Sequence, residues 1–298
     1  MIGGVEMQKL NPLNDFIFQK LFGEKGSEQE LLSLLNAILY SKQKDKLISV
    51  EILENKTLTG ELLNDKMGIL DVRGVTDSGI HVNVEVQRKD YANMHTRSPY
   101  YWSMLLNKAI KKGEDYADLP KIIAINILDF NLFDLPKFHT TYRLREDTHR
   151  EFILTDIMEL HYIEMPKFYK LNEKDLENPL HRWLKFFDKD VPDEELKELI
   201  EMDTAIKQAV EKIDYLSSDE DAVRLYQARE IALFDYKSSI SRAKSEGKLE
   251  GKLEGKLEGK LETAKNLIIE GSSTTFTSKI TGLDKSIIEQ LQKELNNA

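Results

Sequence analysis

The 298-residue chain carries 42 basic and 52 acidic side chains, a net charge of −10, and has no cysteine. Without cysteine, a disulfide framework, zinc–thiolate sites and cysteine nucleophiles are excluded. The first residues lack a signal-peptide pattern, and no stretch approaches the roughly 18 apolar residues of a membrane span. We therefore expect a cytoplasmic protein with no membrane partner, whose contacts with nucleic acid would need a local basic patch.

The N-terminal part is predicted to be helical. Asn14 or Asp15 can cap a short helix that runs through Phe22. A second helix is predicted from Ser27, where Ser27 and Glu30 have the spacing of a capping box. Residues 48–53 then read as a first strand.

The stretch GILDVRGVTDSGIHVNVEVQ, residues 68–87, predicts a β-hairpin. Its valines alternate with polar residues, so one face is predicted to be buried and the other to carry Glu85. A three-residue loop with Gly79 in the left-handed conformation puts Leu70 and Val72 on the same face as Val82, Val84 and Val86. In that register Thr76 pairs with Ile80, and Asp71 lies directly opposite Glu85.

Two carboxylates in such a position repel each other, and two interpretations explain how the repulsion is relieved. In the first, the face is solvated and Arg73 and Arg88 soften the repulsion. In the second, Asp71 and Glu85 bind a hard divalent cation such as Mg²⁺ through their oxygens. Gln87, two residues further along the strand, projects beside them.

Residues 88–112 carry six basic side chains and one acid, a local charge of +5 in an acidic protein. The segment is predicted to form a helix from near Pro99 to about Lys112. Its lysines can be ordinary solvated residues, whereas Arg97 is placed to bind phosphate bidentately. Residues 121–130, nearly all apolar, predict a buried central strand.

Composition divides the rest of the chain. We expect a first domain over residues 1–172, a helical subdomain over 173–245, a GKLE repeat over 246–262 and a small helical tail over 263–298. The repeat has a period of four, so residues at i and i+4 are identical and gain nothing from ion pairing. It predicts a flexible or weakly helical spacer, with an oligomerising helix as the alternative. The tail has the spacing of a helix-turn-helix unit around Gly282, and a small helical cap or dimerisation element fits equally well.

An acid in mid-strand, then an acid-x-Gln on the next strand, within an αβββαβ order, resembles the PD-(D/E)XK nucleases. More closely, the chain resembles the recombination-promoting nucleases, also described as PD-(D/E)XK nuclease family transposases. The matching segments are NDFIFQKLFG (14–23), the hairpin 68–87, the run at 97–128 and LTDIMELHYIEMPKF (154–168). The GKLE repeat and the ITGL tail are also similar to that family.

The resemblance implies an α/β fold with a restriction-endonuclease-like αβββαβ core and a helical C-terminal extension. It implies that Mg²⁺, with Mn²⁺ as an alternative, is held by Asp71, Glu85 and the main-chain carbonyl of Val86. Gln87 stands where the wider superfamily often has lysine, and Asp15 resembles an acid supplied by the first helix, although it could equally be an N-cap. The auxiliary candidates are Asp15, Arg97 and Tyr101, and the candidates for binding nucleic acid are Arg88, Lys89, Arg97 and Lys108.

The activity that follows from the resemblance is divalent-metal-dependent hydrolysis of DNA phosphodiester bonds, linked to recombination or mobile elements. The expected partners are DNA and a second copy of the chain, bound through the C-terminal helices. The residues are also compatible with two other functions: a DNA-binding protein without catalysis, and an assembly factor whose acidic helices and GKLE segment recruit other proteins.

Overall fold

The computed structural model describes residues 9–40, 46–53, 72–110, 113 and 115–296. By its internal contacts the chain divides into two compact units, Met1–Leu233 and Phe234–Ala298. The domain boundaries expected from composition at residues 172, 245 and 262 stay predictions.

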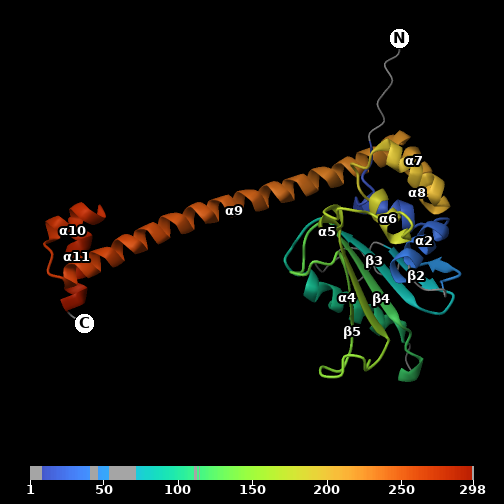
Figure 1. Cartoon of the computed structure of the whole chain (residues 1–298), viewed down its shortest axis with the longest axis horizontal. Coiled ribbons are helices and arrows are strands. Elements are labelled where there is room, and N and C mark those ends of the chain that lie inside the picture. The colour runs from blue at the N-terminus through green and yellow to red at the C-terminus, as the bar shows by residue number, and fades with distance from the viewer. Residues whose placement is uncertain (1–8, 41–45, 54–71, 111–112, 114, 297–298) are drawn as a thin grey trace, which may run out of the picture. The chain divides into compact units, whose positions relative to one another are not determined.

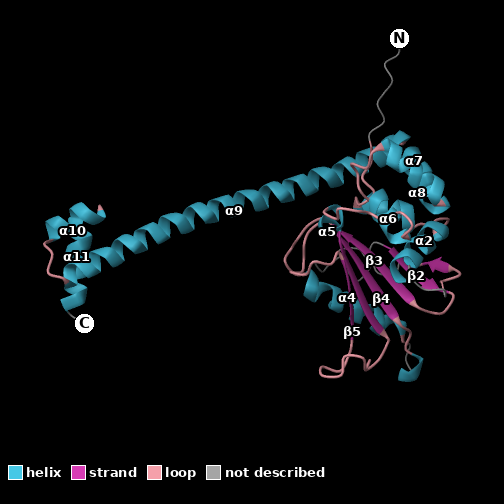
Figure 2. Ribbon diagram, viewed as in Figure 1, coloured by secondary structure: helices cyan, strands magenta, loops and turns pink. Residues whose placement is uncertain are grey.

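The first unit is built on a six-stranded mixed sheet in the order β1-β2-β3-β4-β6-β5 (Figure 2). The first three strands form an antiparallel meander, β4 and β6 run parallel to β3, and β5 is the antiparallel edge strand. The strands are β1 (Val50–Ile52), β2 (Val72–Thr76), β3 (His81–Gln87), β4 (Ile122–Leu128), β5 (His139–Arg143) and β6 (Met158–Glu164).

The central position of β4 follows from its sequence. All seven of its residues are buried, as the apolar run predicted, because helices cover the sheet on both sides. Between β3 and β4 the chain crosses over through helix α4 (Met94–Ala109), which makes the two strands parallel. The predicted αβββαβ order is confirmed (Figure 1).

Helix α4 covers one face of the sheet. Trp102 packs there and donates its indole N–H to the carbonyl of Ile122 at 3.1 Å. The helix begins at Met94, so the predicted start near Pro99 is wrong and Pro99 lies inside the helix. Met94 is buried against the sheet, and this tertiary contact outweighs the hydrogen bond that the proline removes.

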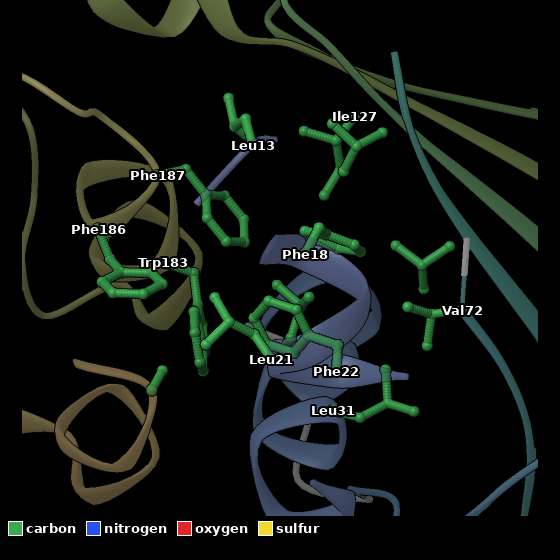
Figure 3. Close-up of a cluster of buried hydrophobic side chains, with 14 of the residues drawn as sticks. Leu13, Phe18, Leu21, Phe22, Leu31, Val72, Ile127, Trp183, Phe186 and Phe187 are labelled. Carbon is green, nitrogen blue, oxygen red and sulfur yellow. The ribbon is translucent and has the colours of Figure 1, made fainter. Parts of the chain in front are cut away.

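The other face of the sheet carries the main hydrophobic core. Figure 3 shows Phe18 and Phe22 between Val72 and Ile127 of the sheet and the aromatic rings of the later helices. Phe22 and Trp183 meet edge to face, with ring centroids 5.4 Å apart. The helices of the first unit on and around this core are α1 (Asp15–Phe22), α2 (Glu28–Leu39), α5 (Met165–Tyr169), α6 (Pro179–Phe186), α7 (Asp193–Met202) and α8 (Thr204–Ser218).

The caps of the first two helices differ from each other. Asn14 caps α1, since its side chain accepts hydrogen bonds from the N–H groups of Phe16 and Ile17. Asp15 therefore occupies the first helical position instead of the cap. Ser27 is the N-cap residue of α2, but its side chain makes no capping hydrogen bond and accepts one from Lys212, so the predicted capping box is wrong.

The second unit contains the C-terminal part of helix α9 (Glu220–Ile269) followed by α10 (Thr274–Thr281) and α11 (Lys285–Asn296). Gly282, with φ +67°, ends α10 in the left-handed conformation, so two helices flank the predicted turn. The turn, through Leu283, and α11, through Ile288 and Leu291, pack against Ala264 of α9. The GKLE repeat lies within α9 and is helical, with its leucines at 249, 253 and 257 exposed.

Among the described residues, no helix combines the length and the hydropathy that a membrane crossing requires.

Candidate functional site

The register of the β2–β3 hairpin positions Glu85. Val72 pairs with Val84, as predicted, and Gly79 has φ +76° in the three-residue loop. The valines of β3 lie in the main core, so Glu85 points to the opposite face, toward α4. Asp71 lies outside the described residues, and its pairing with Glu85 stays a prediction.

Glu85 is buried, with 2% of its surface exposed, which excludes the solvated face as an interpretation of this residue. Arg97 of α4 donates to its carboxylate at 2.9 Å, and Gln87, on the same face of β3, donates at 2.6 Å. Both bonds end on the same oxygen, Oε1. Among the described residues, none donates a hydrogen bond to Oε2.

The electrostatics of Glu85 follow from this incomplete pairing. Burial raises the pKa of the Glu85 carboxyl above its usual value, while the charge of Arg97 and the hydrogen bond from Gln87 offset only part of that effect. A raised pKa means that the ionised carboxylate lacks compensating charge. A further positive charge in contact with Oε2 would stabilise it.

Arg97 connects the carboxylate to an aromatic ring. Its guanidinium carbon lies 4.9 Å from the centre of the Tyr101 ring, one turn further along α4. Its Nε–H is buried and has no hydrogen-bond partner among the described residues. An unpaired buried donor of this kind is costly unless a ligand satisfies it.

A cleft of about 1090 Å³ opens beside these residues. It is bounded by the start of α1, the end of β3 with the following loop, the first half of α4 and the start of α9. Of the predicted site residues, those that line it are Asp15, Val86, Gln87, Arg88, Lys89, Arg97 and Tyr101. Lys108 is exposed near the end of α4 and does not line the cleft, and its role in binding nucleic acid stays a prediction.

Helix α9 contributes side chains to this site that the sequence did not suggest. Arg229 lines the cleft and pairs with Asp15 at 3.4 Å. Glu230 pairs with Arg88 and accepts a hydrogen bond from Asn14 at 2.7 Å. These partners lie more than 140 residues apart in the chain, and no local sequence pattern predicts such contacts.

The donors near Glu85 suit a hard cation. The described residues contain no group of three or more His, Cys, Asp or Glu side chains that could hold a metal ion. What they do provide is a buried carboxylate whose Oε2 receives no hydrogen bond from them, next to Val86 at the wall of the cleft. Oxygen ligands of this type fit Mg²⁺, and the predicted second carboxylate, Asp71, lies outside the described part of the chain.

The fold and this site define a nuclease-like α/β protein, with an antiparallel meander, a crossover helix, a parallel strand and a buried acid-x-Gln on the third strand. Residues 12–243 match the family model described as PD-(D/E)XK nuclease family transposase. The chain belongs to this family. Neither the search of curated proteins nor the search of solved structures found a match.

Proposed function

We propose that the protein is a divalent-metal-dependent DNA endonuclease that acts in the cytoplasm, in recombination or in the mobility of genetic elements. The observation that carries this proposal is the buried, incompletely paired Glu85, whose hydrogen-bond partners Gln87 and Arg97 line a cleft with further cations. Structural ion pairs in protein cores normally satisfy the whole carboxylate, whereas perturbed and partly paired acids concentrate at functional sites.

In this proposal Asp71, Glu85 and the Val86 carbonyl hold Mg²⁺, which supplies charge stabilisation at the phosphoryl oxygens and a more acidic water. Gln87 donates to Glu85 through its amide N–H, which leaves the amide oxygen to accept a hydrogen bond from the attacking water. The Nε–H of Arg97, which has no hydrogen-bond partner among the described residues, donates to the scissile phosphate. Asp15, which also lines the cleft, is an auxiliary acid whose charge Arg229 balances.

The test uses supercoiled plasmid incubated with the protein in Mg²⁺, in Mn²⁺ and in EDTA. We expect cleavage with either metal and none in EDTA. Glu85→Ala should reduce the rate by two orders of magnitude or more, on the order of the effect of losing a main electrostatic group. Glu151→Ala, a change at an exposed glutamate on the β5–β6 loop, is the matched control.

Cleavage that persists in EDTA, or that Glu85→Ala leaves intact, would refute the proposal. DNA binding without cleavage in any metal would favour the non-catalytic alternative. Circular dichroism of Glu85→Ala distinguishes loss of the site from loss of the fold.

We also propose that the GKLE helix pairs with the same helix of a second copy. At 100° per residue, each leucine of the repeat has Lys about 100° to one side and Glu about 100° to the other. Two parallel helices related by a two-fold axis then place Lys beside Glu on both flanks of the leucines, whereas antiparallel helices place like charges together. The exposed leucines at 249, 253 and 257 support this arrangement, and light scattering of a triple Leu→Ser variant tests it.

A further inference from the structure

Two tyrosines at the cleft have no part in the proposed metal chemistry. Tyr100 lines the cleft with 53% of its surface exposed, and Tyr91 lines it with 49% exposed. A single exposed aromatic residue is ordinary on a protein surface. Two exposed tyrosines at one cleft, next to a candidate catalytic acid, indicate a ligand with aromatic faces.

The position of Tyr100 links it to the proposed site through direct contacts. Glu85 contacts Arg97 at 2.9 Å, and the Arg97 guanidinium lies 4.9 Å from the Tyr101 ring. The Tyr101 ring centroid is in turn 6.0 Å from that of Tyr100, with the two planes tilted by 52°. Only Tyr101 therefore stands between the exposed Tyr100 ring and Arg97, which contacts the buried Glu85 carboxylate.

The cleft is lined mainly by basic side chains, three of which also pair with acids: Arg88 with Glu230, Arg97 with Glu85 and Arg229 with Asp15. Its lining contains four cations and one acid in a protein whose net charge is −10. The cations are Arg88, Lys89, Arg97 and Arg229, and the acid is Asp15. Cationic grooves that also present aromatic rings are the common means of binding strands whose bases are unpaired.

We propose that the cleft binds a DNA segment with unpaired bases, and that Tyr100 stacks on one of them. This inference rests on the proposed function and specifies its substrate class. In an intact duplex each base is covered on both faces by its neighbours, so the Tyr100 ring has no base face to contact. A single strand, a flap or a frayed end offers that face, and the cations of the cleft then follow its backbone.

The experiment measures binding in EDTA, where metal-dependent cleavage plays no part. A fluorescently labelled single-stranded oligonucleotide and the blunt duplex of the same sequence are titrated with the full-length protein at one low salt concentration. We expect the single strand to bind on the order of ten-fold more tightly than the duplex, since stacking on one ring contributes that much per base.

Variants of Tyr100 separate stacking from other contacts. Tyr100→Leu removes the π face and should weaken single-strand binding on the order of ten-fold, with little effect on the duplex. Tyr100→Phe keeps the ring and should bind like the wild type. Tyr116→Leu is the matched control, because Tyr116 is 83% exposed and does not line the cleft.

Equal affinities for single strand and duplex would overturn the inference. A Tyr100→Phe variant that binds the single strand as weakly as Tyr100→Leu would also overturn it, because the loss would then come from a hydroxyl contact to the DNA backbone. If Tyr100→Leu fails to fold, the comparison of single strand with duplex on the wild-type protein still decides. Absence of metal-dependent cleavage together with Tyr100-dependent single-strand binding would refute the proposed function alone. Cleavage of plasmid without any single-strand preference would refute this inference alone.

Discussion

Two buried glutamates on the same sheet have opposite surroundings. Glu85 on β3 is 2% exposed, and Glu159 on β6 is 3% exposed. Hydrogen bonds from described residues reach one oxygen of Glu85, whereas both oxygens of Glu159 are used. Lys121 donates to Oε2 of Glu159 at 2.7 Å, and His161 donates to Oε1 at 2.9 Å together with Arg143.

The pKa values of the two carboxyls diverge accordingly. Burial by itself would raise the pKa of Glu159, but the hydrogen bonds from His161, Arg143 and Lys121 outweigh it and hold that pKa far below its usual range. The pKa of Glu85 is instead raised. Burial of an acid therefore does not by itself indicate a functional site; the number of partners that compensate its charge separates a structural acid from a candidate catalytic one.

The largest expected effect on stability is at Glu159. Glu159→Gln leaves Lys121 and Arg143 without a counter-charge and should lower the free energy of unfolding by about 2–3 kcal/mol, because both cations keep some contact with water. Urea denaturation measures the change. The control Glu151→Gln, at an exposed glutamate, should change the free energy of unfolding by less than about 0.5 kcal/mol. A loss for Glu159→Gln as small as that of the control would contradict a structural role for Glu159.

Added metal should stabilise the protein through Glu85 and leave the Glu159 cluster unaffected. Mg²⁺ or Mn²⁺ at 100 times its Kd should stabilise the wild type by about 2.7 kcal/mol, by mass action on the folded state. Glu85→Gln and Asp71→Asn should lose most of this gain in thermal melts. Asp71→Asn should also melt higher than the wild type in EDTA, since one of two facing charges is gone. Equal metal-induced shifts in all three proteins would contradict a shared ion.

A smaller effect concerns Glu85 without metal, and its sign depends on pH. Because the folded pKa of Glu85 is raised, the native state holds this proton more tightly than the unfolded chain, so stability from this group falls as pH rises above 4.5. Glu85→Gln should therefore be more stable than the wild type at neutral pH in EDTA, with the difference vanishing as the pH falls toward 4.5.

Glu159 should respond to acid in the opposite direction. Its folded pKa is lowered, so its contribution is present above 4.5 and is lost as the pH falls further. Denaturation curves of the two glutamine variants and the wild type, from pH 8 down to well below 4.5, test both signs. A Glu85→Gln variant that is less stable than the wild type at neutral pH would show that Glu85 is fully compensated.

The smallest effect is expected from removing residues 246–298. Every residue that lines the cleft lies at or before Leu233, within the first unit. Metal-dependent cleavage should change on the order of two-fold or less, since all the residues that line the cleft are retained. A truncated protein with folded circular dichroism but no cleavage would mean that the C-terminal helices complete the site, for instance through a second copy.

Local sequence determined much of the frame of this site. Alternation of valine with polar residues and the need for a left-handed Gly79 specified the hairpin register, because a shift of one residue would bury the wrong face. The continuous apolar run likewise predicted β4. Both patterns depend on contacts between residues near in sequence or on burial of a whole segment, and both can be read without knowing the remainder of the fold.

Tertiary structure alone decided which partners the charged groups have. Arg97 reaches Glu85 because α4 begins at Met94, a start that depends on packing against the sheet. From α9, Arg229 lines the cleft and Glu230 pairs with Arg88, although nothing near them in sequence predicts either contact. No sequence pattern predicted β5 and β6, which carry Arg143 and His161, two of the partners that compensate the charge of Glu159. A charge is stabilised by whatever lies within a few ångströms, and that distance is set by the packing of helices and strands that are remote in the chain.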